Sequence, residues 1–191
     1  MDTPRMARTR PLLSDLSAYW ALFCVDPGGH TGVAMSYVPM LETIQASMVA
    51  RLAPRSLTIE GAEPVQIRAL YDQWMRFKRE AVKNQVTLGR IELVFEDFTL
   101  RGGMHAGGKD GTSPERITWG FEGYRMGRRD AWRRDANYTP MILQTASQAH
   151  TMATRQRLEG WGCWVKGREH ERMAYAHMAL RVARLLRAYA R

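Results

Sequence analysis

The distribution of apolar residues divides the chain into strand-like runs and helical stretches. Residues 20–25 (WALFCV) form a continuous apolar run, which is typical of a strand buried on both faces. Two further apolar segments follow at short intervals, residues 31–38 and 46–53. We expect these three strands to form an antiparallel meander, because short connections join antiparallel neighbours. Residues 91–98 and 140–145 predict a fourth and a fifth strand.

Helical periodicity separates the third strand from the fourth. Apolar side chains recur at helical spacing over residues 62–84, with polar ones mostly on the opposite side; they are Val65, Ala69, Leu70, Trp74, Phe77 and Val82. A crossover of this length is the normal way to join parallel strands, so we expect the fourth strand to run parallel to the first. Further helices are predicted over residues 114–134, 147–159 and 168–189.

Three consecutive strands followed by alternating helices and strands is the element order of the ribonuclease H-like fold. We therefore expect an α/β protein with a five-stranded mixed sheet and helices on both faces. Residues 1–15 predict a flexible basic arm, and residues 16–191 a single domain. The glycine-rich stretch over residues 99–113 predicts a loop.

Charge is distributed unevenly along the chain. The formal net charge is +9. Residues 1–98 carry 11 basic and 11 acidic side chains, residues 99–134 carry 8 and 4, and residues 151–191 carry 9 and 3. This excess in the second half points to a polyanionic partner, most often nucleic acid. A generally basic surface without a binding role is the alternative.

Cysteine usage and hydropathy bear on the compartment. Cys24 and Cys163 form no CxxC pair and lie in apolar strings, so we expect buried free thiols. No stretch reaches the ~20 apolar residues of a membrane span, and the N-terminus lacks a signal-peptide core. We expect no membrane association and a cytoplasmic location, in the host cytoplasm if the chain is phage-encoded.

Two acidic residues end predicted neighbouring strands. Asp26 is followed by the glycine turn Pro27-Gly28-Gly29, and Glu96 stands near the end of the fourth strand. Ligands bind at the carboxyl ends of strands in open α/β sheets, and two carboxylates there repel each other unless a proton or cation intervenes. Oxygen ligands suit Mg²⁺, with Mn²⁺ as a substitute. The alternatives are a turn-capping role for Asp26 and an arginine-paired edge carboxylate for Glu96.

Several motifs together resemble the RuvC-type Holliday junction resolvases of the phage-like branch of the ribonuclease H-like superfamily. They are CVDPGGHTGVA, LVFEDF, SPERITWGFEGY, LQTASQAHTMATRQRLEGWGCW and GREHERMAYAHMAL. The resemblance implies two-metal cleavage of branched DNA in recombination and repair. It makes Asp26, Glu96 and His170 the catalytic metal ligands. It also assigns Glu96, rather than the adjacent Asp97, to the site.

The sequence departs from the family pattern at Met173. The family has a histidine or aspartate followed three residues later by aspartate, which places both ligands on one helical face. A thioether is a poor Mg²⁺ ligand. Glu171 or Glu169 then supplies the missing ligand, or one metal binds weakly, or the protein binds branched DNA without cutting it efficiently.

The resemblance also implies DNA contacts and a two-fold dimer. Trp119, Phe121, Tyr124 and Met126 are candidates for the apolar dimer face. The predicted contacts to the duplex arms are Lys109, Arg116, Arg125, Arg128 and Arg129. An actin-like ATPase would also account for the DPGGHTG turn, but it requires a second phosphate loop, for which we find no candidate.

Overall fold

The computed structural model describes residues 19–39, 54–98, 113–129, 139–164 and 166–189. Its elements, in chain order, are β1 (Tyr19–Asp26), β2 (Thr31–Pro39), β3 (Arg55–Ile59), α1 (Glu63–Lys83), the short 3₁₀ helix η2 (Leu88–Arg90), β4 (Ile91–Asp97), α2 (Pro114–Arg129), β5 (Met141–Thr145), α3 (Ala146–Met152), α4 (Arg155–Gly160) and α5 (Glu169–Tyr189).

The five strands form one mixed sheet in the order β3-β2-β1-β4-β5. The pairs β1–β2 and β2–β3 are antiparallel, whereas β1–β4 and β4–β5 are parallel. This topology confirms the predicted α/β class and the ribonuclease H-like arrangement. The third strand lies at Arg55–Ile59, whereas the segment predicted for it, residues 46–53, lies outside the described residues.

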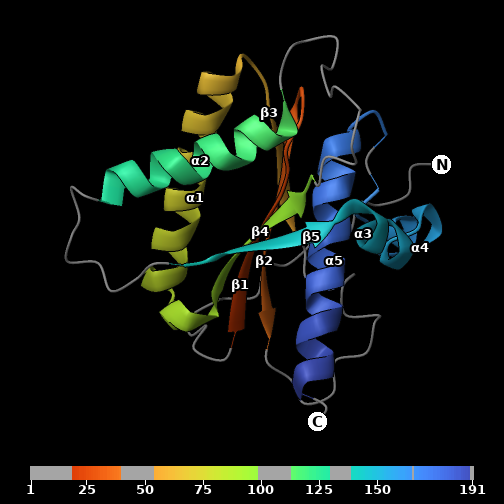
Figure 1. Ribbon diagram of the computed structural model, residues 1–191. Coiled ribbons are helices and arrows are strands. Elements are labelled where there is room, and N and C mark those ends of the chain that lie inside the picture. Colours follow the sequence, from red (N-terminus) through yellow and green to blue (C-terminus); the bar gives the residue numbers. More distant parts are fainter. Residues whose placement is uncertain (1–18, 40–53, 99–112, 130–138, 165, 190–191) are drawn as a thin grey trace, which may run out of the picture.

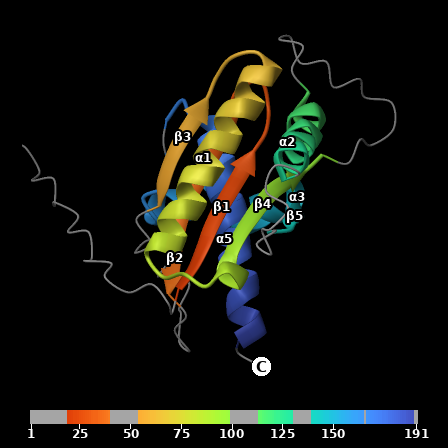
Figure 2. The ribbon, with the colours of Figure 1, turned by 90° about the vertical axis from the view of Figure 1, so that its left-hand side faces the viewer.

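Helices cover both faces of the sheet (Figures 1 and 2). Phe23 and Val25 point to the side where α1 and α2 pack, and Leu22 and Cys24 point to the side of α5. This alternation follows from the strand pleat, which sends successive side chains to opposite faces. We refer to these two sides as the α1/α2 face and the α5 face.

The predicted bounds of α1 were correct, but the prediction of which of its side chains are buried was partly wrong. Leu70, Trp74 and Phe77 are buried as predicted, but Val65 and Val82 are 57% and 48% exposed. Gln66 and Ala81 are buried in α1 as well. Spacing alone missed Gln66, which is buried because hydrogen bonds satisfy its amide.

The helix predicted over residues 147–159 is two helices, α3 and α4. Thr154 ends the continuity, because its backbone is extended and its hydroxyl accepts a hydrogen bond from the Arg157 amide at 3.4 Å. A hydroxyl that caps a new helix in this way favours a break at that residue.

Several predictions concern segments outside the described residues. These are the basic arm, the glycine-rich loop up to residue 112 and the end of the helix predicted to reach residue 134. Cys24 and Cys163 are buried free thiols, as predicted. Among the helices of the described ranges, none is long and apolar enough to cross a membrane.

Candidate functional site

Asp26 and Glu96 lie at the carboxyl ends of neighbouring parallel strands. Val25 of β1 pairs with Phe95 of β4, so the residues that follow them are neighbours as well. Both carboxyl groups point to the α5 face, in step with Cys24 and Val94. The alternation sends Asp97 to the opposite face. Asp26 is 4% exposed and Glu96 is 6% exposed. We call these two residues the acidic pair.

The two carboxyl groups of the acidic pair differ in pKa. The pKa of Asp26 is raised to about 8, chiefly by burial; the hydrogen bond with His170 opposes this rise, and the hydrogen bond with the Glu96 carboxyl group adds to it. Burial alone would raise the pKa of Glu96, but hydrogen bonds to His177 and Asp26 outweigh it and leave that pKa lowered. Of the two carboxyl groups, Asp26 is therefore the one that retains a proton more readily, and Glu96 is the one that ionises. A buried pair that retains a proton is one that a cation would stabilise.

His170, in the first turn of α5, contacts the first acid of the pair. Its Nδ1 lies 2.7 Å from Asp26 Oδ2, and this hydrogen bond raises the pKa of the imidazole. Two glycines make the approach possible. A Cβ on Gly28 would lie 2.6 Å from His170 Cε1, and one on Gly32 would lie 2.1 Å from the His170 backbone. The resemblance predicted His170, whereas the reason for the two glycines emerges only from the packing.

Gln66 fixes the glycine turn beside Asp26. Its Nε2 donates to the carbonyl oxygens of Gly29 and Gly61, both at 2.8 Å, and its Oε1 accepts from Thr31 Oγ1 at 2.6 Å. These three bonds satisfy a fully buried amide. They tie the turn to α1, so the acidic pair is supported from both faces of the sheet.

His177 contacts the second acid of the pair and was not among the predicted site residues. It is fully buried, with Nε2 3.0 Å from Glu96 Oε2 and Nδ1 3.3 Å from Gln144 Oε1. Gln144 itself pairs with Glu96 in the β4–β5 register. The seven-residue spacing from His170 places both histidines on one helical side. That spacing was visible in the sequence, but nothing there separated a site residue from a structural one.

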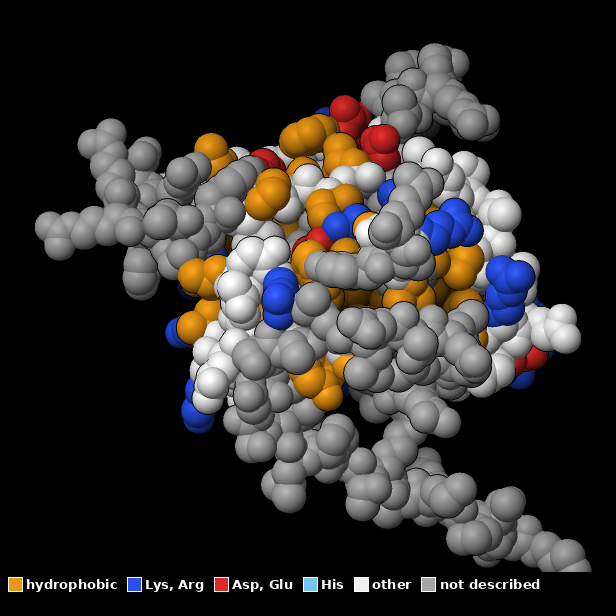
Figure 3. All heavy atoms as spheres, turned by 90° about the horizontal axis from the view of Figure 1, so that it is seen from below, with side chains coloured by type: hydrophobic (Ala, Val, Ile, Leu, Met, Phe, Trp, Pro, Cys, Tyr) orange, Lys and Arg blue, Asp and Glu red, His pale blue; other side chains and the backbone are white. Residues whose placement is uncertain are grey.

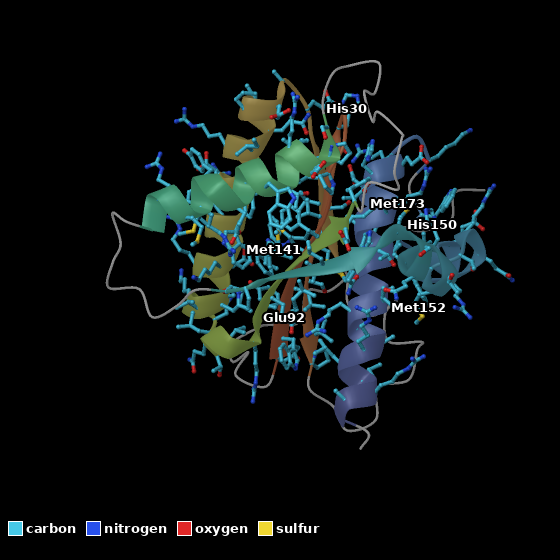
Figure 4. The ribbon with its side chains drawn as sticks, viewed as in Figure 1. His30, Glu92, Met141, His150, Met152 and Met173 are labelled. Atoms are coloured by element: carbon cyan, nitrogen blue, oxygen red, sulfur yellow. The ribbon has the colours of Figure 1, made fainter. Side chains whose placement is uncertain are left out.

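Two further histidines lie at the edge of the acidic pair. The ring of His30 is 6.5 Å from that of His170, measured between centroids. His150 of α3 is close enough for its charge to lower the pKa of Glu96. Figure 4 shows His150 on α3 and Met173 on α5, two helices that pack against each other. The surroundings of the acidic pair are thus rich in imidazole.

Glu171 does not join the acidic pair. Its carboxylate is fully buried and accepts hydrogen bonds from Ser56 Oγ at 2.5 Å, Thr58 Oγ1 at 2.7 Å and Arg168 at 3.1 Å. Ser56 and Thr58 belong to β3, two strands away from β1. The predicted ligand Glu171 therefore anchors α5 to the sheet edge. Met173 is half-buried and packs against the hydrophobic residues of the α5 face.

The predicted DNA contacts have different environments. Arg116 and Arg128 of α2 are exposed, and Arg128 lies over the Tyr124 ring at 5.3 Å. Arg125 is buried: it donates to Glu122 at 2.9 Å and to the Thr139 carbonyl oxygen at 2.6 Å. The prediction that Arg125 contacts DNA is wrong, because those contacts hold its side chain inside the protein. Lys109 and the Arg129 side chain lie outside the described parts.

The acidic pair fits a single divalent cation better than it fits a metal site with many protein ligands. Within the described ranges, no group of three or more His, Cys, Asp or Glu side chains is arranged to hold a metal ion. The two buried carboxyl groups nevertheless provide hard oxygen donors. The thioether of Met173 adds no ligand for Mg²⁺. The residues therefore fit one Mg²⁺ or Mn²⁺ ion more readily than two.

Comparison with known proteins finds matches among solved structures, and two of these are structures of RuvC. No family model matches the chain, and no curated protein matches it. The structure of Thermus thermophilus RuvC matches with a TM-score of 0.49 and 13% identity, covering 86% of this chain and 96% of the other. The structure of T. thermophilus RuvC in complex with a Holliday junction substrate matches with a TM-score of 0.47 and 11% identity, at the same coverage. With TM-scores below 0.5, neither likeness says what this chain does.

Proposed function

We propose that this protein is a metal-dependent endonuclease that cleaves Holliday junctions or other branched DNA. The observation that carries the proposal is the acidic pair, buried side by side at the carboxyl ends of β1 and β4, with a histidine on each member. Two further features support it. One is the positive charge of the second half of the chain, and the other is the resemblance of its motifs to RuvC-type resolvases.

Asp26 and Glu96 would hold the ion, with His170 beside them. A bound Mg²⁺ or Mn²⁺ would activate water and stabilise the oxygen that leaves phosphorus. The protein's own contribution is orientation. His170 fixes one oxygen of Asp26, and His177 fixes one oxygen of Glu96 from the buried side. Since Glu96 is ionised, His177 Nε2 is the donor in that bond. Supporting contacts of this kind tune a metal site by about 10–100-fold in affinity or activity.

The test is cleavage of a synthetic four-way junction, labelled on each strand in turn, with Mg²⁺, with Mn²⁺ and with EDTA. A linear duplex of the same sequence is the matched substrate. We expect metal-dependent nicks near the branch point and little cleavage of the duplex. Equal cutting of both substrates would contradict branch selectivity. Stable binding of the junction without cleavage under either metal would contradict the nuclease.

Met173 favours a second candidate function, a branched-DNA binding protein with weak or no cleavage. A side chain that cannot bind Mg²⁺ stands where the family has an aspartate, and Glu171 is committed to β3. The same assay separates the two candidates, because this function predicts retention of the junction without metal-dependent products.

The proposal includes a two-fold dimer, so that paired cuts fall on symmetric strands. Of the four residues predicted for its apolar face, Trp119 and Met126 are 55% and 43% exposed on α2. Phe121 is fully buried, and Tyr124 contacts the Tyr71 ring of α1. Trp119 and Met126 are therefore the residues to change when the molecular mass in solution is measured.

A further inference from the structure

Two arginine side chains lie against Trp164, on the α5 side of the molecule, and further basic residues stand near it in sequence. The guanidinium of Arg172, in α5, lies 4.3 Å from the centroid of the Trp164 ring, and that of Arg155, in α4, lies 5.0 Å from it. Lys166, Arg157 and Arg168 are exposed nearby in sequence. We call these five basic residues and Trp164 the Trp164 patch.

The aromatic ring holds two of these charges in place. Stacking engages the flat face of a guanidinium, whereas its N–H donors lie in the plane of the group, where they meet phosphate oxygens. Arg155 is 73% exposed despite its ion pair with Glu159 at 2.8 Å. A guanidinium ordered before binding loses less conformational entropy when it contacts a phosphate. The arrangement therefore favours a polyanion over a single small anion.

The Trp164 patch lies next to the acidic pair. Arg168 and Arg172 stand two residues before and after His170, which contacts Asp26. A step of two residues turns about 200° around a helix, so Arg172 occupies the outer side of the turn whose inner side carries His170. The two sides are about 10–12 Å apart, the width of a helix with its side chains.

The other basic side chains are less well placed to bind DNA beside the acidic pair. Arg128 belongs to α2, which packs on the opposite face of the sheet, and Arg125 is buried. At the end of the molecule away from His30, Figure 3 shows Lys and Arg side chains standing apart, with hydrophobic ones between them. Among the described residues, the Trp164 patch thus combines closeness to the acidic pair with several charges.

We propose that the Trp164 patch binds the phosphate backbone of the DNA strand that leads into the acidic pair. This inference rests on the proposed function and specifies which surface carries the DNA. It differs from the sequence-based expectation, which placed the contacts on the glycine-rich loop and α2. The basic side chains of the Trp164 patch carry their charge without a bound metal, so DNA binding at the patch would be independent of the metal.

The test measures the salt dependence of junction binding by fluorescence anisotropy in EDTA, where no cleavage occurs. The double variant Arg155→Gln/Lys166→Gln removes two charges from the patch. The control Arg79→Gln/Lys83→Gln removes two exposed charges from α1, on the opposite face. Each lost phosphate contact lowers the log–log salt slope by about 0.9, so we expect a fall of nearly two for the patch variant and none for the control.

The outcomes separate this inference from the proposed function. Wild-type binding with equal slopes for both double variants would overturn the Trp164 patch and leave the nuclease proposal intact. Absence of junction binding by the wild-type protein would overturn both. Lys166→Gln alone, with thermal melting as the folding control, gives the same test with half the expected change.

Discussion

The two faces of the sheet are built from different chemistry. On the α1/α2 face, the ring of Phe23 packs edge-on against that of Trp74, with 5.5 Å between centroids. The rings of Phe95 and Phe121 are tilted against each other at 5.2 Å. On the α5 face the same two strands carry acids. Each of these acids contacts a basic residue of α5: Asp26 with His170, Glu96 with His177 and Glu92 with Arg181.

The difference shows where the acids of these two strands gather: both faces have a hydrophobic cluster, and the α5 face adds acids to it. Close-packed aromatic side chains give the α1/α2 face a large hydrophobic contribution to folding. Buried ion pairs contribute little net stability, because removing charges from water offsets much of their attraction. The α5 face has a hydrophobic cluster as well, and beside it the acids and their basic partners hold charge in a defined geometry. Such an arrangement is typical of a functional site.

Loss of the Asp26 charge should produce the largest change on the α5 face. We expect Asp26→Asn to lower metal-dependent junction cleavage by more than about 100-fold, because removing a metal ligand should cost more than removing a supporting contact. Thermal stability should stay equal or rise, since a buried acid beside Glu96 is replaced by a neutral amide. Cleavage at the wild-type rate under matched metal would contradict the assignment of the site.

Gly28→Ala should separate the position of His170 from its chemistry. The added Cβ would lie 2.6 Å from His170 Cε1, so the imidazole must shift away from Asp26. We expect a loss of cleavage of about 10–100-fold, as for other supporting contacts. Gly89→Ala is the control, because a Cβ there meets nothing within 4 Å. Equal effects of the two substitutions on cleavage would show that the fit of His170 against Gly28 is unimportant.

How far the sequence could predict these features depends on their range. Four of the five strands, the parallel β1–β4 pair and the meeting of Asp26 and Glu96 at the strand ends were predictable, because apolar runs and short motifs are local signals, whereas the third strand was expected at residues 46–53 and lies at Arg55–Ile59. The roles of Gly28, Gln66 and His177 were not, because each depends on a contact with a distant element. Glu171 was misplaced for the same reason: the hydroxyls of Ser56 and Thr58, more than 110 residues away, bind its carboxylate.

Met173→Asp should increase the metal-dependent activity of the α5 face. The substitution restores an acid three residues after His170, and we expect cleavage with Mg²⁺ to increase by about tenfold, on the scale of a metal-site contact. Because Met173 is half-buried, the new carboxylate needs a cation nearby, so the melting temperature should rise more with added Mg²⁺ than in the wild type. A folded variant that cuts no better would show that Met173 does not limit the reaction.

The pH dependence of stability should also differ between the two faces. The folded chain holds the Asp26 proton until about pH 8, whereas the unfolded chain releases it near pH 3.8. The unfolded state therefore binds fewer protons between these values, so stability falls as pH rises. The raised pKa of His170 acts in the same direction, since its stabilisation is lost as pH rises through the folded value.

Asp26→Asn removes both effects, so its free energy of unfolding should vary less between pH 4 and 8 than that of the wild type. Chemical denaturation at several pH values gives the comparison. A variant with the same pH slope as the wild type would contradict the assignment of a proton to Asp26.

Metal binding without DNA tests the central claim most directly, because it requires no substrate and no turnover. Mn²⁺ is titrated into three proteins: the wild type, Asp26→Asn and the surface control Glu80→Gln. Electron paramagnetic resonance follows the free ion, so the titration measures how many Mn²⁺ ions each protein binds and how tightly. Glu80 is 41% exposed and pairs with Arg55, at the far side from α5. We predict one strong Mn²⁺ site in the wild type and in Glu80→Gln, and its loss in Asp26→Asn. Equal Mn²⁺ binding by all three proteins would contradict a metal site at the acidic pair.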